Sequence, residues 1–276
     1  MSFFRLKQLY KEKVLMFSFI ILMIVSTAQV IDSLVAETLK QPGSYPTSLS
    51  YAWLLSNDGN SFFPFFFLFL ILPLSSVSFS YHFSKELKSG YANYFIIRSN
   101  LFSYLKHMIT INSFVSIFLI GVPLVWNVLL SSFFFPVLKS NELVDYMRKF
   151  PVTETETLNK ILYQNHPLIT IFMYILLAIV FTVAFNNFIL LIGYFLNNSY
   201  VLFSLTVLIP LLGVVLPSPY TLSHLVFLMV VSNSINLFSF LYPLFFLFIS
   251  SVFLLLLIMK TGGIQLNDSK LFFKKR

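Results

Sequence analysis

The chain has no cysteine, and only 10% of its 276 residues carry a charged side chain. The absence of cysteine excludes disulfide bonds, thiol catalysis and thiolate metal sites. The histidines are scattered and no H-E-x-x-H pattern occurs, so the sequence predicts no metal site. The four histidines are His82, His107, His166 and His224.

Catalytic and nucleotide-binding motifs are also absent. The sequence contains no G-x-x-x-x-G-K-[ST] loop, which would cradle the phosphates of ATP, and no G-x-S-x-G nucleophile elbow. No candidate pair of nucleophile and base stands out either. We therefore predict that the chain is not an enzyme and carries no cofactor of its own.

The long apolar runs have no charged residue in their middle. Ion-coupled carriers usually place carboxylates or histidines at membrane depth, because an ionisable group there is costly unless it takes part in function. This absence argues against a carrier or an intramembrane enzyme.

What the chain does contain is apolar. Hydrophobic residues make up 58% of it, 35 residues are Phe, and the mean hydropathy is +0.85. Soluble domains are not this apolar, and no polar segment is longer than the 131–166 connection, so no soluble domain is expected. The composition predicts one all-α polytopic membrane domain over residues 1–276, with the lipid bilayer as a partner. The net charge of +8 then reflects membrane topology and not nucleic-acid binding.

The pattern predicts six transmembrane helices and an N-terminal interfacial helix over residues 2–13. Residues 35–61 are expected to form a polar external loop, and residues 216–237 an external re-entrant segment, with a complete seventh span as the alternative. Six spans put most Lys and Arg residues and both termini on the cytoplasmic side, whereas a seventh would place the Lys-rich tail outside. The six spans are about 14–34, 62–83, 108–130, 167–196, 200–215 and 238–259.

A basic stretch from residue 84 to 107 interrupts the apolar runs. Between Gly90 and Tyr104 its apolar positions recur every three or four residues, which is typical of short helices along the membrane surface. An ordinary basic cytoplasmic loop is the alternative. Its charged residues are Lys85, Glu86, Lys88, Arg98 and Lys106.

Several amides lie within the predicted spans. Such groups usually form hydrogen bonds between helices. The functional alternative is that they line a translocation path for a substrate. The candidates for this path are Asn112, Asn127, Asn186 and Asn187, and Gln29 is a further amide within a span.

The stretch after the second span resembles the first cytoplasmic loop of type-2 ATP-binding-cassette (ABC) exporter permeases. The family pattern runs from a glutamate and a glycine, through an apolar stretch and a basic residue, to a tyrosine and a lysine. Ser99-Asn100 stands where the family commonly has a proline, and the 131–166 connection is longer than expected. The matching residues are Glu86, Gly90, Ile96, Ile97, Arg98, Tyr104 and Lys106.

The resemblance implies a half-transporter in a bacterial cell membrane. Residues 85–98 would form a coupling helix that docks on a cytoplasmic ATPase subunit, which holds the ATP and Mg. A second permease copy or a homologue would complete the exporter, and its cargo would be a peptide such as a bacteriocin, a lipid-like molecule or a drug. For Glu86 and Arg98, pairing with headgroups or within the chain is the alternative role. The implied coupling residues are Lys85, Glu86, Lys88, Gly90 and Arg98.

A different class of function stays open at this point. The chain could be a membrane immunity or scaffold protein that binds a toxin or partner without turnover. Its external 131–166 connection would then be the active part. Dependence of the phenotype on ATP separates the two hypotheses.

Overall fold

The structure is a computed structural model. It describes residues 13–40, 46–55, 62–89, 92, 96, 100–138, 166–196, 199–215 and 244–260. Within these ranges the chain is all helical and contains no strand. Most of the predicted interfacial helix, the predicted re-entrant segment at 216–237 and residues 139–165 of the long connection lie outside the described residues.

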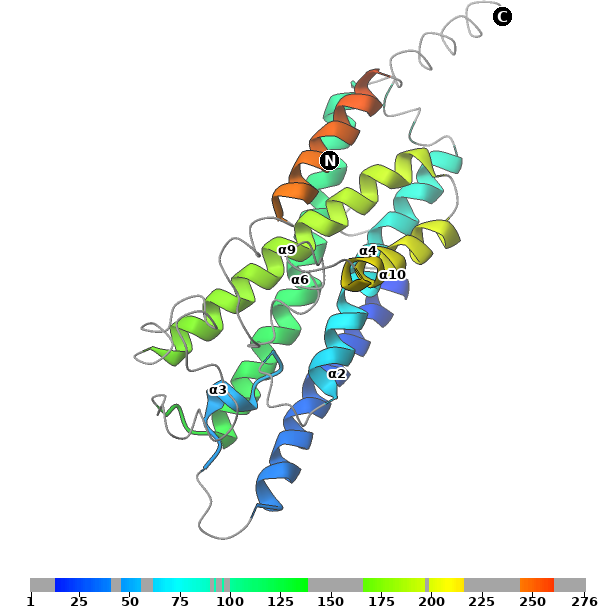
Figure 1. Cartoon of the computed structure of the whole chain (residues 1–276). Coiled ribbons are helices and arrows are strands. Elements are labelled where there is room, and N and C mark those ends of the chain that lie inside the picture. Colours follow the sequence, from blue (N-terminus) through cyan, green and yellow to red (C-terminus); the bar gives the residue numbers. More distant parts are fainter. Residues whose placement is uncertain are drawn as a thin grey trace, which may run out of the picture.

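The described chain forms long helices that run back and forth through one bundle (Figure 1). Helices α2 and α6 run in one direction, and α4 and α9 run in the other. The helices are α2 (Lys13–Thr38), α3 (Leu49–Ala52), α4 (Phe63–Lys88), α6 (Leu101–Phe134), α9 (Pro167–Phe195), α10 (Ser199–Val215) and an unlabelled helix, Leu244–Lys260.

Three of these helices, α2, α6 and α9, are long and apolar enough to cross a membrane. The shortest of them, α2, has 26 residues. At about 1.5 Å per residue it reaches roughly 39 Å, which exceeds the ~30 Å hydrocarbon core of a bilayer. The membrane character predicted from composition is therefore supported by the lengths of these helices.

The helix boundaries match the predicted spans best for α9 and α10, each within one residue at both ends. Helix α9 begins at Pro167, at the first helical position, and ends at Phe195, one residue before the predicted end. Helix α4 continues to Lys88, past the predicted end at residue 83, and α6 begins at Leu101 instead of residue 108. The predicted boundaries were set where charged residues begin, but a helix keeps its backbone hydrogen bonds through such residues, whose side chains reach water.

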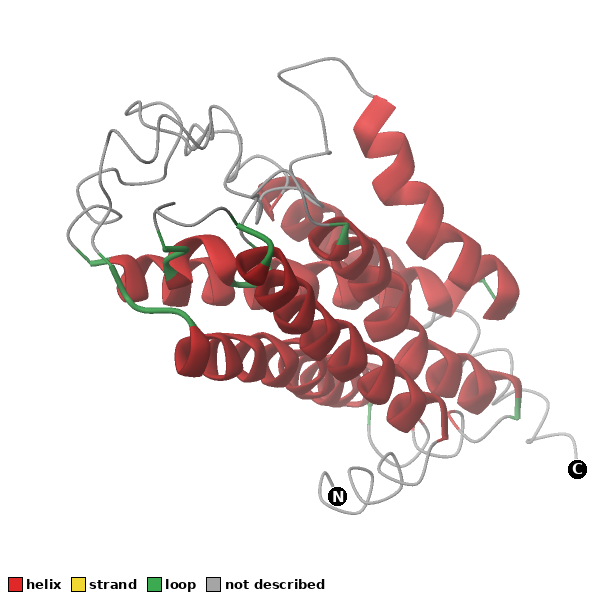
Figure 2. Ribbon diagram, turned by 90° about the horizontal axis from the view of Figure 1, so that it is seen from below, coloured by secondary structure: helices red, strands yellow, loops and turns green. Residues whose placement is uncertain are grey.

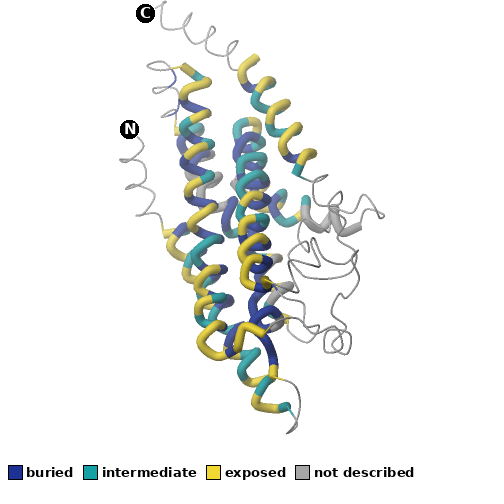
Figure 3. Tube along the Cα trace, turned by 90° about the vertical axis from the view of Figure 1, so that its left-hand side faces the viewer, coloured by how far each residue is buried: buried dark blue, intermediate teal, exposed yellow. Residues whose placement is uncertain are grey.

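The helices α2 and α9 each pack against both α4 and α6, and α10 packs against α4 and α9. Seen from below, the helices lie packed side by side (Figure 2). Buried residues follow the sides on which the helices face one another, and exposed residues follow the outer sides (Figure 3). An apolar outer surface is what a lipid environment requires of such a bundle.

Two hydrophobic clusters fill the bundle. One lies toward the end that holds α3 and includes Trp53, Leu124 and Phe181. The other lies toward the opposite end and includes Phe83 and Leu105. The helix Leu244–Lys260 contributes Leu247 to the first cluster and Ile258 to the second.

Two glycines mark close helix contacts. A Cβ atom at Gly193 of α9 would lie 3.3 Å from the Leu202 side chain of α10. A Cβ atom at Gly121 of α6 would lie 3.3 Å from the Ile179 side chain of α9. Small residues at such positions let neighbouring helices approach, which is the usual means of packing helices in membranes.

Candidate functional site

Polar side chains from three helices meet in the middle of the bundle. The amide nitrogen of Asn186 on α9 donates to Ser116 Oγ on α6 over 2.7 Å. The hydroxyl of Ser75 on α4 donates to Asn186 Oδ1 over 3.2 Å. One buried amide thus joins α4, α6 and α9. We call this group the central amide cluster; its members are Ser75, Asn112, Ser113, Ser116, Asn186 and Asn187.

A second pair of contacts joins α6 and α9 in the same cluster. Asn112 Nδ2 donates to Asn187 Oδ1 over 2.8 Å, and Asn187 Nδ2 donates to Ser113 Oγ over 3.0 Å. The Oδ1 atom of Asn112 is buried and accepts no hydrogen bond from the described part of the chain. The spacing explains the arrangement, because residues 112, 113 and 116 lie within one turn of α6 and present neighbouring side chains.

A separate group of polar contacts lies toward the α3 end. Asn127 on α6 donates to Gln29 Oε1 on α2 over 2.7 Å and to the carbonyl oxygen of Ser26 over 2.9 Å. Its own Oδ1 accepts from the backbone N–H of Leu54 at 2.8 Å. Gln29 Nε2 donates to the carbonyl oxygen of Ala52 over 2.8 Å. We call Gln29 and Asn127 the clasp.

These positions bear directly on the predicted translocation path. The structure brings Asn112, Asn186 and Asn187 together and places Asn127 in the separate clasp. All four form hydrogen bonds, and Asn112, Asn127 and Asn186 are fully buried. The interhelical hydrogen bonding that the sequence analysis gave as the usual role of such amides is therefore present. A substrate path along these amides stays a prediction.

The predicted coupling stretch begins inside α4. Lys85, Glu86 and Lys88 lie in its last turn, so this part is continuous with the second apolar helix. Ala92 and Ile96 are helical and buried farther along. Gly90 and Arg98 lie outside the described residues.

Glu86 is held within the chain. Its side chain is only 7% exposed, and Tyr104 on α6 donates its hydroxyl proton to Glu86 Oε2 over 3.0 Å. The Tyr104 ring stacks on Phe83 of α4, with 6.4 Å between ring centroids. Of the two roles considered for Glu86, pairing within the chain is the one observed. This contact fixes the end of α4 to the beginning of α6.

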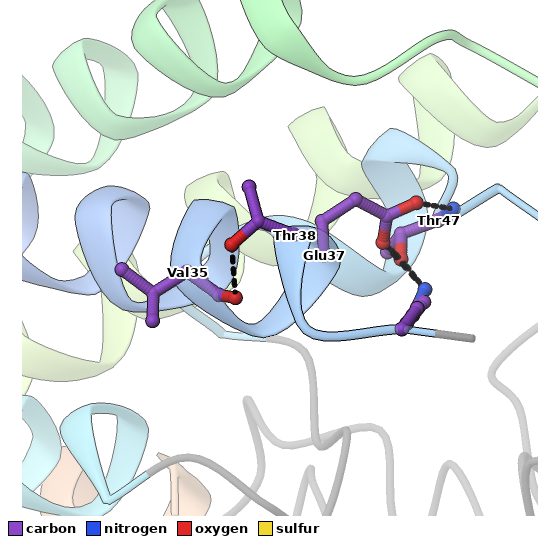
Figure 4. Close-up of polar contacts among 5 residues, drawn as sticks. Val35, Glu37, Thr38 and Thr47 are labelled. Atoms are coloured by element: carbon purple, nitrogen blue, oxygen red, sulfur yellow. Dashed lines mark hydrogen bonds and ion pairs between the residues drawn. The ribbon is translucent and has the colours of Figure 1, made fainter. Parts of the chain in front are cut away.

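A further polar group lies where α2 ends, and sequence reasoning missed it. Glu37 points toward Thr47, whose backbone N–H donates to Glu37 Oε1 over 3.1 Å (Figure 4). Lys40 pairs with the same carboxylate and with the Thr47 hydroxyl. Beside this group, Thr38 Oγ1 donates to the carbonyl oxygen of Val35 over 2.8 Å. The spacing of Glu37 and Lys40 was the one available signal, since residues three apart share a helix face.

The polar groups found are suited to joining helices and not to acid–base or metal chemistry. Within the described ranges no group of three or more His, Asp or Glu side chains is placed to hold a metal ion. The buried polar contacts are mostly neutral amides and hydroxyls, which bond to one another and to backbone groups. Glu86, near the end of α4, is the exception, since it is a buried carboxylate.

Comparisons of the chain with family models, with curated protein sequences and with solved structures find no match.

Proposed function

We propose that the chain is the membrane-spanning permease subunit of an ABC exporter, driven by a separate cytoplasmic ATPase. The observation that supports this most is the anchored end of α4. A helix end that carries Lys85 and Lys88 emerges from an apolar bundle and is joined to α6 by Glu86 and Tyr104. A force applied there by a docked subunit would pass into two helices at once.

The central amide cluster extends this connection. Through Asn186 it joins α4 to α6 and α9, so the three helices would move as one body when the end of α4 is displaced. Interhelical hydrogen bonds in membranes contribute about 0.6 kcal/mol each on average and up to about 1.7. Several such bonds, added to close packing, make a rigid unit out of helices that face lipid on their outer sides.

The proposed topology has six spans and two cytoplasmic termini. Helices α2, α6 and α9 would be three of the spans, and α4, α10 and the helix Leu244–Lys260 the others. On this topology the end of α4 faces the cytoplasm and α3 faces the opposite side. A second permease copy or a homologue completes the transporter, and the cargo is amphipathic or apolar, in keeping with Phe-rich walls.

The assignment of the docking residues changes in one respect because of the structure. A buried Glu86 positions the end of α4 through Tyr104, and the contacts with the ATPase fall to the basic residues around it. Charge reversal at Glu86 would break its hydrogen bond with Tyr104, so a loss of function could not be assigned to docking. The informative variants are therefore Lys88→Glu and Arg98→Glu.

The test reconstitutes the permease with its ATPase and measures assembly and ATP hydrolysis by the complex. We expect the Lys88→Glu, Arg98→Glu double variant to lose both. Lys40→Glu is the matched control, because it reverses a lysine at the opposite end and disturbs only its contacts with Glu37 and Thr47 there. Full assembly and unchanged hydrolysis in the double variant would refute the docking assignment.

A further inference from the structure

Residues 46–55, which we call the α3 segment, do not behave as the polar external loop that composition predicts. Leu49 and Ala52 are 1% exposed, and Leu54 and Leu55 are fully buried. The segment contributes these residues to the hydrophobic cluster at its end of the bundle. It therefore enters the bundle at the end where α2 stops.

The α3 segment joins three helices at this end of the bundle. It contacts α6 and α9, and its backbone is bonded to α2 through Gln29. Trp53 is 2% exposed and lies against Tyr174 of α9, with 6.5 Å between ring centroids. A buried tryptophan in this place packs the segment against α9 and adds to the hydrophobic cluster at this end of the bundle.

The clasp supplies hydrogen-bond partners for the backbone of this segment. The C=O of Ala52 and the N–H of Leu54 are bonded to the side chains of Gln29 and Asn127, each at 2.8 Å. Buried backbone groups need partners, and a regular helix would supply them from its own backbone. Here two side chains, one from α2 and one from α6, supply them, so the clasp holds the backbone of the segment against these helices.

The beginning of the segment is fastened more loosely. Thr47 is bonded to the partly exposed side chains of Glu37 and Lys40, and the N–H of Leu49 donates to the carbonyl oxygen of Pro136 over 3.0 Å. Surface ion pairs contribute little to stability. The clasp and the buried apolar residues are consequently the main hold on the segment.

We propose that the α3 segment is a gate that closes this end of the bundle, and that the clasp of Gln29 and Asn127 is its latch. When the latch opens, the segment withdraws, and a passage between α2, α6 and α9 is exposed to an amphipathic substrate. The passage role rests on the proposed export function. The burial of the segment and its release by the latch do not depend on that function.

The first experiment measures thiol labelling in single-cysteine variants, which the cysteine-free chain allows without background. Ser48→Cys and Ala52→Cys report on the α3 segment, and Leu39→Cys, at a position 79% exposed, is the labelled reference. In lipid nanodiscs a water-soluble maleimide reaches both faces of the membrane, so the labelling result does not depend on which face each cysteine lies on. We expect the two segment positions to label much more slowly than the reference. Equal labelling would overturn the proposal.

The latch is tested by adding Asn127→Ala or Gln29→Met to the Ala52→Cys variant. Each removes one of the two side-chain hydrogen bonds to the backbone of the segment. If that loss favours opening by roughly 1.4 kcal/mol, the labelling rate of the introduced thiol is expected to rise about tenfold. Asn186→Ala is the matched control, because it removes an equally buried amide from the central cluster without touching the segment. Unchanged labelling in both latch variants, or an equal rise in the control, would refute the latch.

The second experiment locks the segment. Ser33 Oγ lies 3.5 Å from the carbonyl oxygen of Ala52, so the two residues are neighbours, and formation of a disulfide in the double variant Ser33→Cys, Ala52→Cys is verified by mass spectrometry before the assay. In the complex with the ATPase, oxidation should lower ATP hydrolysis to that of the ATPase alone, and a reductant should restore it. Unchanged hydrolysis in the cross-linked complex would refute the gate and leave the permease assignment standing. Failure to find any ATPase partner would instead refute the permease assignment, and the labelling results would still decide the latch.

Discussion

The central amide cluster makes a quantitative prediction about Asn186. This residue accepts from Ser75 and donates to Ser116, so Asn186→Ala removes two interhelical hydrogen bonds and part of a fully buried side chain. Each bond is worth about 0.6 to 1.7 kcal/mol in a membrane, and the small cavity adds roughly 1 kcal/mol. We expect the free energy of unfolding to fall by about 2 to 4 kcal/mol.

The assay is a double-mutant cycle on the purified protein in bicelles, with unfolding followed by steric trapping. Ser116→Ala, Asn186→Ala and the double variant isolate the contact between the two side chains. We expect a coupling free energy of about 1 kcal/mol, since the two groups are direct partners at 2.7 Å.

A second cycle supplies the control. Asn127 belongs to the clasp and shares no hydrogen-bond partner with Asn186. The effects of Asn186→Ala and Asn127→Ala should therefore add to within about 0.5 kcal/mol. A coupling between Asn186 and Ser116 no larger than that of this distant pair would refute the view that the cluster joins the helices.

Three further predictions follow from single contacts. Tyr104→Phe removes the hydroxyl that binds Glu86 and should lower the free energy of unfolding by about 1 to 3 kcal/mol, measured by the same trapping assay; no change would show that this contact does not anchor α4. Gly193→Val would press on Leu202 and should cost about 1 to 3 kcal/mol, seen as a lower thermal midpoint in detergent; an unshifted midpoint would contradict the close contact. Glu37→Ala breaks a partly exposed ion pair and should cost only about 1 kcal/mol or less, and a loss comparable to that at Tyr104 would contradict the view that this pair is peripheral.

Much of the fold could be predicted because the helices follow simple rules. A long apolar run after a proline predicted α9 almost to the residue. The ends of α4 and α6 were harder, because Lys85, Glu86 and Lys106 marked a loop by composition although the helices continue through them. Charged side chains at helix ends reach the interface without ending the helix.

The α3 segment was missed because the apolar run Trp53-Leu54-Leu55 is short and surrounded by polar residues. Its burial depends on two side chains distant in sequence, Gln29 and Asn127, which supply the hydrogen bonds that its backbone needs. No local pattern contains that information. The run of three large apolar residues in a supposed external loop was the signal that could have indicated it.

The site could be predicted only in part for a similar reason. The buried amides were recognisable as polar residues within apolar spans, and hydrogen bonding between helices was one of the two roles considered. Which amide meets which partner depends on how each helix is rotated about its axis, as the separate positions of Asn127 and Asn186 show. The pairing of Glu86 with Tyr104 likewise depends on the antiparallel contact of α4 and α6.

The central claim is that this chain works with a cytoplasmic ATPase that docks on the basic end of α4. The most direct measurement is a pull-down of the tagged protein from its native membrane in a mild detergent, with identification of the co-purified proteins by mass spectrometry. We expect a soluble subunit that carries a G-x-x-x-x-G-K-[ST] phosphate-binding loop and that is lost when residues 85–98 are replaced. A preparation without such a subunit, under conditions that hold known ABC transporters together, would contradict this proposal and favour an immunity or scaffold protein.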